Sequence, residues 1–332
     1  MGGNGSAAAQ TDARRLRAER VFDFLDELVG SLQVPAGHRD LLRIHLEEGR
    51  EQAREIPDLA ATQLPLLVHG AITGEEASGL PLAAACTLVY LGADLLDNVA
   101  DDELPPRWAS RSAGEATLAA ATFLAALPTF ALEQLSTGPS RLWSIDRTLA
   151  RGLVEMSAGQ HEDLGPTESF ELSAGRAVAE RKSGAEFACF GRAAALLAGA
   201  DAAVADAYAA CGAAFGTAAQ IASDVSELYR GTGRRDLRNR KRPLPVMHAL
   251  ATLSPAERAK LERSLDSTGP GAVDELREQL RSARSFQYAT LVVEVYVRRG
   301  LAALAAARGR EPAAGELRAL LEGASLLRGS HR

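Results

Sequence analysis

The stretch LGADLLDNVADDE at residues 91–103 places five acidic residues in ten positions of an otherwise apolar segment. Asp97 and Asp101 are four residues apart, so on a helix they share one face, and Asp94 lies one turn before Asp97. Like charges at this spacing repel one another unless a cation compensates them, and clustered carboxylates are suited to Mg²⁺. The alternative is a solvated helix end, because the prolines at 105–106 stop the helix soon afterwards.

The composition around this stretch predicts an all-α protein. The chain has 332 residues, of which 46% are hydrophobic, 5% are aromatic and 64 are alanine. Ala, Leu and Arg favour helices, whereas β-branched and aromatic residues are scarce. Helical periodicity runs in segments of about 15 to 35 residues that short Gly/Pro breaks separate. We therefore expect a flexible tail over residues 1–15 and a single all-helical bundle domain over residues 16–332.

Charge and cysteine usage exclude several classes of protein. A formal net charge of −6 argues against a general nucleic-acid binder, and the apolar content argues against disorder. Cys86, Cys189 and Cys211 lie far apart in apolar sequence, so we expect buried, reduced thiols. Without a strongly apolar, uncharged run of about 18 residues, stable membrane insertion is not expected. We predict a cytoplasmic protein.

A second carboxylate group lies within the segment QIASDVSEL. Gln220, Asp224 and Glu227 stand at helical positions i, i+4 and i+7 and therefore share one face. They follow a long Ala-rich stretch, which predicts a mostly buried helix. Buried carboxylates need partners, and a metal ion would supply one. The alternative is a polar surface stripe on a helix that is otherwise buried.

The chain has only three lysines, which are Lys182, Lys241 and Lys260. The first two fall beside polar clusters. Lys182 follows a segment in which Gln160 and Asp163 lie one turn apart. Lys241 belongs to RRDLRNRKR at residues 234–242, which holds six basic residues in nine positions. Such a run is usually solvated or faces nucleic acid, but next to carboxylate clusters it is suited to closing over a polyphosphate.

Taken together, these segments resemble the isoprenyl (polyprenyl) diphosphate synthase family. The similarity runs from about residue 80 to 255 and rests on five motifs in the family's order. They are Asp97-Asn98-Val99-Ala100-Asp101 for DDxxD, Gly159-Gln160 to Asp163-Leu164 for GQxxDL, Lys182-Ser183-Gly184 for KT(G/A), residues 220–227 for QIxDDxxD, and residues 236–245 for DLRNGKxTLP. Asn98, Ser223 and Glu227 depart from the family's aspartates.

The resemblance implies a helical bundle around a central apolar cavity, with the two aspartate motifs facing each other across it. It implies that Asp97, Asp101, Asp224 and Glu227 hold Mg²⁺ on an allylic prenyl diphosphate substrate. It places Arg107, Lys182, Gln220, Arg235 and Lys241 on the diphosphate. Of these residues, Asp97, Asp101, Asp224, Lys182 and Lys241 would carry catalysis by drawing diphosphate away to leave an allylic cation. Family members are usually homodimers, so we expect one here.

Two departures weaken the expected site for a second diphosphate. Elongating members carry GGKRxRP before the first motif, whereas residues 59–65 here read LAATQLP. The family's Arg-Arg after the first motif is reduced to Pro106-Arg107. Losing two or three charge-assisted contacts of roughly 1.5–3 kcal/mol each would lower the affinity for isopentenyl diphosphate by several orders of magnitude.

Three functional interpretations follow. The first is a non-elongating enzyme, which cyclises the cation as a terpene cyclase does, or transfers it to a small-molecule or peptide acceptor. The second is chain elongation with isopentenyl diphosphate, held by basic residues from elsewhere such as Arg43, Arg50 or Arg54. The third is a non-catalytic subunit of a heteromeric prenyl synthase, which the retained aspartates and lysines oppose.

Substrate length depends on the residues just before the first motif. In the family these positions form the cavity floor, and here they include Val89, Gly92 and Ala93. The small Gly92 and Ala93 leave room, which favours a C15 or C20 substrate. Asp94 in this stretch is unusual and is interpreted as an extra metal ligand, a group that steadies a cation, or part of a polar helix face.

Overall fold

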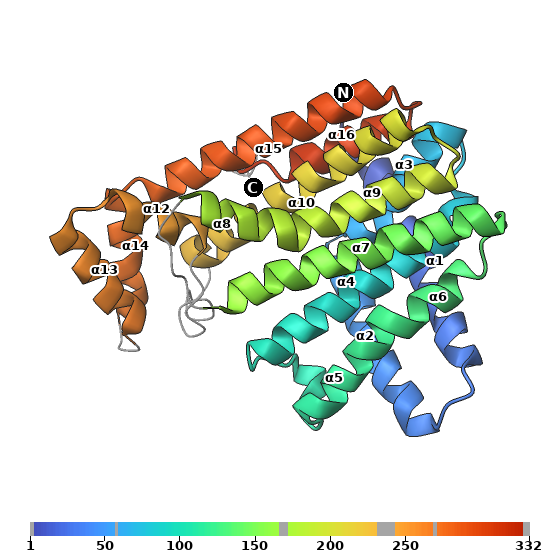
Figure 1. Cartoon of the computed structure of the whole chain (residues 1–332), viewed down its shortest axis with the longest axis horizontal. Helices are drawn as coiled ribbons and strands as arrows, with labels where there is room; N and C mark the ends of the chain where they lie inside the picture. The colour runs from blue at the N-terminus through green and yellow to red at the C-terminus, as the bar shows by residue number, and fades with distance from the viewer. Residues whose placement is uncertain (1–2, 57–58, 166–171, 231–242, 268–270, 328–332) are drawn as a thin grey trace. The chain divides into compact units, whose positions relative to one another are not determined.

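The chain forms helices throughout the part for which the structure, a computed structural model, gives positions. It describes residues 3–56, 59–165, 172–230, 243–267 and 271–327. No β-strand occurs within these ranges (Figure 1), which confirms the predicted all-α class. The chain divides into two compact units, each assembled from segments that are distant in sequence. The single domain over residues 16–332 stays a prediction.

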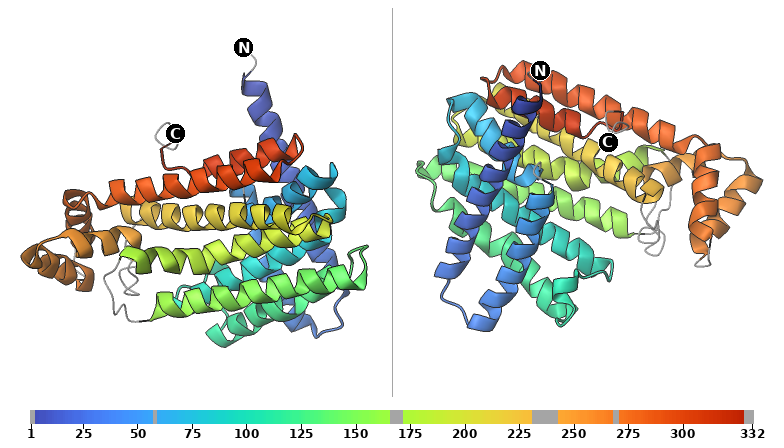
Figure 2. Two further views of the ribbon diagram at one scale, coloured as in Figure 1. Left: turned by 45° about the horizontal axis from the view of Figure 1, so that its top comes forward. Right: turned by 180° about the vertical axis from the view of Figure 1, so that it is seen from behind.

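Unit 1 consists of Met1–Thr148, Phe190–Ala205 and Gly309–Leu317. The elements within Met1–Thr148 are α1 (Gly3–Ser31), α2 (Ala36–Glu55), α3 (Ala60–Thr73), η1 (Ala77–Gly79), α4 (Leu80–Ala100), η2 (Pro106–Trp108), α5 (Ala113–Ala121), η3 (Thr122–Ala126) and α6 (Leu127–Leu132). The apolar α4 packs against α1, α3, α5 and α6, and α1 lies beside α2 (Figure 2). The helix that carries the first acidic motif is therefore the core helix of this unit.

Unit 2 consists of Leu149–Cys189, Asp206–Arg308 and Arg318–Arg332. Its elements include α8 (Leu172–Ala179), η4 (Glu180–Gly184), α12 (Leu244–Thr252), α13 (Pro255–Asp266), α14 (Ala272–Ser282) and α15 (Ser285–Ala307). Four helices have residues in both units: α7 (Pro139–Leu164), α9 (Ala185–Leu197), α10 (Ala202–Arg230) and α16 (Ala313–Gly323). In unit 2, α15 runs alongside α10 (Figure 1).

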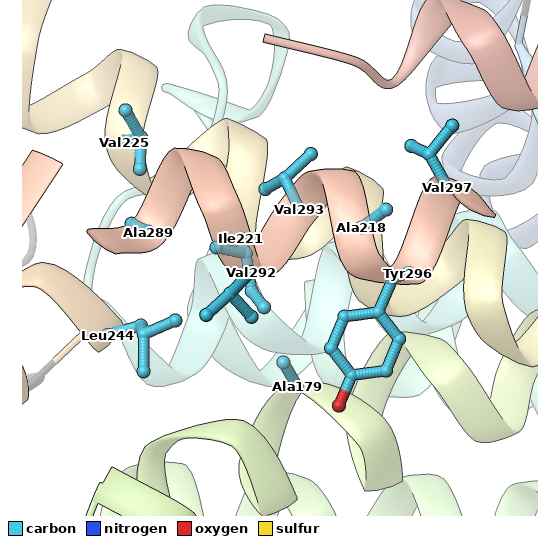
Figure 3. Packing of buried hydrophobic residues seen from close by; sticks show 10 residues of the cluster. All are labelled: Ala179, Ala218, Ile221, Val225, Leu244, Ala289, Val292, Val293, Tyr296 and Val297. Atoms are coloured by element: carbon cyan, nitrogen blue, oxygen red, sulfur yellow. The ribbon is translucent and has the colours of Figure 1, made fainter. Parts of the chain in front are cut away.

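The core of unit 2 joins these two helices to their neighbours (Figure 3). Ile221 and Val225 of α10 meet Val292 and Val293 of α15, and Tyr296 extends the same cluster. These side chains are nearly inaccessible to solvent, and apolar burial of this kind contributes about 25 cal/mol per Å². This packing holds α10, and with it the second carboxylate group, firmly against α15.

The N-terminal segment is helical from residue 3 onward, and the flexible tail over residues 1–15 stays a prediction. The helix α1 begins at Gly3 and runs unbroken to Ser31. Ala7, Ala8 and Ala9 have the highest helix propensity, so the helix extends beyond the part that the core requires.

Two stretches are long and apolar enough to cross a membrane by length and composition alone. They are Ala77–Ala100 and Ala113–Leu132, and 67% and 44% of their apolar windows are buried. A core helix of a folded protein passes the same test, and α4 within the first stretch is such a helix. The two stretches are weak evidence for membrane insertion, which the sequence did not predict.

All three cysteines lie within the described residues, and each is a buried thiol outside any disulfide, as expected from the sequence. Burial raises the pKa of Cys211 to about 12, so this thiol stays protonated and unreactive at neutral pH.

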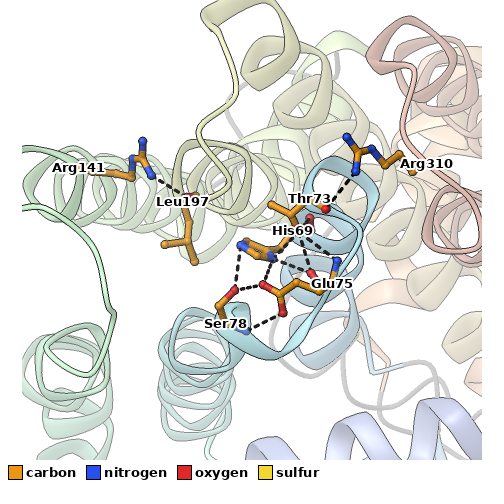
Figure 4. Close-up of polar contacts among 7 residues, drawn as sticks. All are labelled: His69, Thr73, Glu75, Ser78, Arg141, Leu197 and Arg310. Atoms are coloured by element: carbon orange, nitrogen blue, oxygen red, sulfur yellow. Dashed lines mark hydrogen bonds and ion pairs between the residues drawn. The ribbon is translucent and has the colours of Figure 1, made fainter.

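The turn that follows α3 is closed by polar contacts (Figure 4). Gly74 ends the helix with a left-handed φ of 91°, and His69 Nδ1 lies 2.9 Å from the Glu75 carbonyl oxygen. The Arg310 Nη1 group donates to the Thr73 carbonyl oxygen over 3.1 Å. An arginine thus satisfies a helix-end carbonyl that has no partner within its own helix.

A buried ionic cluster ties three segments of unit 1 together. Arg17 of α1 contacts Glu316 of α16 at 2.6 Å and Glu76 at 2.7 Å, and the Arg17 side chain is only 10% exposed. Burial alone would lower the pKa of Arg17, but the hydrogen bonds that Arg17 donates to Glu316 and Glu76 outweigh it and raise that pKa. The guanidinium is therefore permanently charged and neutralises two carboxylates that have little access to water.

Replacing Arg17 by alanine should leave both carboxylates uncompensated. We expect Arg17→Ala to lower the free energy of unfolding by about 3–5 kcal/mol, measured by urea denaturation. The control is Arg20→Ala on the same helix, where the side chain is exposed and a change within about 0.5 kcal/mol is expected. Equal losses in the two variants would contradict this account.

Candidate functional site

The first acidic motif lies at the C-terminal end of α4. Asp97 is half-buried, Asp101 is only 6% exposed, and Asp94 is exposed. The Asn98 Nδ2 group donates to Asp94 Oδ2 over 3.2 Å, so the asparagine of the motif is turned toward Asp94. The helix stops because Asp102 adopts a left-handed φ of 55°. The predicted grouping of Asp94, Asp97 and Asp101 at one end of a buried helix is thus present.

The segment after this motif is anchored on α2. Trp108 is fully buried and its Nε1 group donates to Glu48 Oε2 over 3.0 Å. Its neighbour Arg107 contacts Glu47 at 3.2 Å and also donates to Glu51. The hydrogen bond to Glu51 raises the pKa of Arg107, and the charge of Glu51 adds to the effect. The predicted diphosphate-binding arginine is therefore paired with two carboxylates.

A cavity of about 400 Å³ opens beside these residues. Its polar lining is mainly acidic and comprises His45, Glu48, Glu51, Gln52, Glu55, Asp94 and Arg107. A diphosphate carries several negative charges, and four carboxylates against one arginine oppose its entry.

The other basic residues considered for a second diphosphate are also engaged. Arg50 contacts Glu19 at 2.6 Å and Asp23 at 2.9 Å on α1, and Arg54 contacts Glu19 at 2.7 Å. In place of the family's basic segment, the first turn of α3 is buried, and Gln63 Nε2 donates to the Arg14 carbonyl oxygen. This turn thus brings no cation where elongating relatives would have one.

The three residues predicted to form a cavity floor differ in their burial and in what surrounds them. Val89 is buried and Ala93 is half-buried. A Cβ atom on Gly92 would lie 2.7 Å from Leu124 and 3.0 Å from Phe123, which belong to the π-helical turn η3. The room that Gly92 leaves is therefore filled by Leu124 rather than open, so Gly92 does not support a longer substrate. Sequence could not reveal this, because the neighbour comes from another helix.

In unit 2, Lys182 lies in a π-helical turn between α8 and α9. This turn, η4, spans Glu180–Gly184, and such wider turns are rare and often mark functional sites. Lys182 Nζ lies 3.2 Å from Asp163 Oδ2 of α7. Both side chains are about one-fifth exposed, so the pair is shielded from bulk solvent. The GQxxDL and KT(G/A) segments thus meet.

A chain of hydrogen bonds links the same turn to the second motif. Ser183 Oγ donates to Gln220 Oε1 over 2.7 Å, and Gln220 Nε2 donates to Asp224 Oδ1 over 2.9 Å. Asp224 and Glu227 are both half-buried, whereas Ser223 is exposed. The turn η4 therefore places Lys182 beside Asp163 and, through Ser183, contacts the hydrogen-bonded pair Gln220 and Asp224. Arg235 and Lys241 lie outside the described residues and stay predictions.

Glycines allow the close approach that builds this network. A Cβ atom on Gly159 of α7 would lie 2.6 Å from the Lys182 backbone nitrogen, and one on Gly216 of α10 would overlap the Ser183 carbonyl oxygen. The turn η4 is thus in backbone contact with both helices. The glycine of the GQxxDL segment is required for this packing.

Comparison with known proteins identifies the family. The family model for polyprenyl synthetase matches residues 95–282, more than half of the chain and a range that includes all five motifs in full. This chain belongs to the polyprenyl synthetase family. It is therefore a class I isoprenoid prenyltransferase. No significant match is found among curated proteins.

Solved structures of other polyprenyl synthetases share the fold. A geranylgeranyl pyrophosphate synthetase from Pyrococcus horikoshii Ot3 is 17% identical, with a TM-score of 0.81 over 97% of this chain and 99% of that one. A decaprenyl diphosphate synthase from Rhodobacter capsulatus is 20% identical, with a TM-score of 0.76 over 96% of each chain. A geranylgeranyl pyrophosphate synthase from Corynebacterium glutamicum, complexed with isoprenyl diphosphate and magnesium, is 17% identical, with a TM-score of 0.78 over 95% and 98%.

The carboxylates of this polyprenyl synthetase suit Mg²⁺. Among the residues that the structure describes, no three His, Cys, Asp or Glu side chains gather into a complete metal site. Mg²⁺, however, is usually held by one or two carboxylates together with substrate phosphates and water. Asp97 and Asp101, two hard oxygen donors on one helix end, fit that mode.

The network also contains residues that the sequence motifs missed. Tyr296 of α15 donates a hydrogen bond to Glu180, the first residue of η4. The two residues are 116 positions apart, and neither belongs to a motif. The sequence around a buried tyrosine on a helix gives no sign of such a distant partner.

Alanine at position 159 should disrupt the turn. In a free helix Gly→Ala stabilises by about 1 kcal/mol, but here the new Cβ would press on the Lys182 backbone. We expect Gly159→Ala to lower the free energy of unfolding by about 1–3 kcal/mol, measured by urea denaturation. Gly37→Ala in α2, where a Cβ meets nothing within 4 Å, is the matched control and should be neutral or stabilising.

Proposed function

We propose that this protein is a Mg²⁺-dependent enzyme that ionises an allylic prenyl diphosphate, with C15–C20 substrates favoured by the small Ala93. The observation that carries the proposal is the network around η4, in which Lys182 lies beside Asp163 and Ser183 connects through Gln220 to Asp224. It supplies a cation and an oriented carboxylate in one preorganised group.

Each residue has a defined task in the proposed reaction. Lys182 would contact the diphosphate as a compact point charge, assisted by Gln220, Arg235 and Lys241. Asp97 and Asp101 at the end of α4, and Asp224 and Glu227 on α10, would hold Mg²⁺. When bound, the metal neutralises negative charge on the departing diphosphate. The hydrogen bond that Gln220 donates to Asp224 Oδ1 orients this carboxylate.

The comparisons favour chain elongation as the fate of the allylic cation. The structures similar to this chain include geranylgeranyl and decaprenyl diphosphate synthases. In elongation, the C1–O bond of the allylic diphosphate breaks, the cation bonds to the double bond of isopentenyl diphosphate, and a proton is lost. The interpretation placed first from the sequence, cyclisation or transfer to another acceptor, therefore becomes the second candidate.

A specific observation still supports that second candidate. Arg107 is paired with Glu47 and Glu51, and the cavity beside it is acidic. Arg50 and Arg54 are held by carboxylates of α1. A second diphosphate would meet a negative surface there, whereas an uncharged acceptor or an internal double bond would not. We further propose a cytoplasmic homodimer. Retention of both metal-binding motifs argues against a non-catalytic subunit.

Product analysis separates the two candidates. The protein is incubated with Mg²⁺ and geranyl, farnesyl or geranylgeranyl diphosphate, each with and without isopentenyl diphosphate. Elongation predicts a longer diphosphate only when isopentenyl diphosphate is present. The second candidate predicts a hydrocarbon, an alcohol or a prenylated acceptor from a single diphosphate. Size-exclusion chromatography with light scattering checks the dimer.

Removal of one metal-binding carboxylate should abolish turnover under either candidate. We expect Asp97→Ala to lower kcat by at least about 10²-fold, because a charge-stabilising contact to the leaving group is lost. Exposed Asp102→Asn, next to the motif, is the control, because asparagine removes the charge and tolerates the left-handed φ at this position. Unchanged turnover of Asp97→Ala within a complex with a second synthase subunit would instead favour the non-catalytic role.

A further inference from the structure

A tyrosine of α15 holds the first residue of the π-helical turn. Tyr296 is 6% exposed, and its ring lies in the core of unit 2 with Ala179, Ala218 and Ile221 (Figure 3). Its hydroxyl donates to Glu180 Oε1. Apolar packing thus fixes the ring, while the hydroxyl points out of the core toward Glu180, the first residue of η4.

The electrostatic surroundings keep this hydroxyl a donor. Burial, together with the hydrogen bond to Glu180, raises the pKa of Tyr296 to about 12. Arg299 lies over the ring at 5.1 Å from its centre. A neutral hydroxyl facing a carboxylate makes a charge-assisted hydrogen bond, which is stronger than a neutral one. The positive charge of Arg299 acts to lower the pKa of Tyr296 but does not outweigh the other two effects, so at neutral pH the hydroxyl is protonated and can donate.

The turn η4 has contacts on three sides. Gly159 of α7 and Gly216 of α10 touch its backbone at Lys182 and Ser183, and Tyr296 holds its first side chain at Glu180. A π-helical turn contains one residue more than an α-helical path would need, and it has an α-helical alternative. A change to that alternative would rotate every following side chain by about 100°. The directions in which the Lys182 and Ser183 side chains point therefore depend on whether the turn is π-helical or α-helical.

We propose that Tyr296, acting through Glu180, is a positioning residue that holds η4 in the path that directs Lys182 toward Asp163 and Ser183 toward Gln220, and so sets the affinity for diphosphate. This inference rests on the proposed function, in which Lys182 contacts the diphosphate. Tyr296 itself touches no reacting group. It acts as a fixed point in the core from which the binding lysine is oriented.

The test replaces Tyr296 by phenylalanine, which removes only the hydroxyl oxygen. Binding of inorganic diphosphate in the presence of Mg²⁺ is measured by titration calorimetry for the wild type, Tyr296→Phe and Lys182→Ala. We expect Tyr296→Phe, which keeps the buried ring, to weaken binding by about tenfold, since one charge-assisted hydrogen bond holds the turn. Hydrogen exchange of the amides at residues 180–184 should become faster, while the thermal midpoint changes little.

Controls separate positioning from a general loss of structure. Glu180→Gln keeps an acceptor and should bind nearly as the wild type, whereas Glu180→Ala should match Tyr296→Phe. The double variant Tyr296→Phe/Glu180→Ala should be no worse than either single one. Tyr288→Phe, on the same helix and stacked on His248 at 4.3 Å, should change nothing.

The outcomes distinguish the inference from the proposed function. If the wild type binds diphosphate, Lys182→Ala does not, and Tyr296→Phe binds as tightly as the wild type, the inference is overturned while the proposed function stands. If the wild type does not bind, or Lys182→Ala binds equally well, the role of Lys182 fails and the inference fails with it. Additive losses in the double variant would also overturn it.

Discussion

The candidate site of unit 2 depends on direct contact between helix backbones at η4. A Cβ atom on Gly159 would come within 2.6 Å of the Lys182 nitrogen, and one on Gly216 would lie still closer to the Ser183 carbonyl oxygen. Only glycine permits this distance, because any side chain would push the helices apart. The approach brings Asp163 within 3.2 Å of Lys182 and Gln220 within 2.7 Å of Ser183. Removing the contact would separate the cation from the carboxylates.

Polar contacts inside the core then determine directions that packing alone would leave open. In unit 1, Arg17 joins α1 to α16 and to the turn at Glu76. In unit 2, Tyr296 joins α15 to Glu180. Alanine-rich helices bury little area per residue and slide easily over one another, so specific polar pairs are an effective way to hold their register.

The charge of the surface near the first motif bears on which co-substrate can bind there. Under the proposed elongation, a second diphosphate would have to bind near the first motif. The cavity beside Arg107 is nevertheless mainly acidic, and that arginine already has two carboxylate partners. These pairs are exposed and individually weak, so a diphosphate could displace them only against the net charge of the surrounding carboxylates. The net charge of this cavity therefore decides whether an anionic or an uncharged co-substrate can bind beside the first motif.

Sequence alone determined the helical class, the burial of the three cysteines, the placement of Asp97 and Asp101 on one helix end, and the motifs that identify the family. Each follows from composition or from spacing along one helix, which are local properties. The tertiary structure decided that Leu124 fills the space beside Gly92, that Arg107 pairs with α2, and that Tyr296 holds Glu180. Periodicity shows which residues share a helix face but not which helix covers it. Contacts between residues 116 positions apart depend on how whole helices pack.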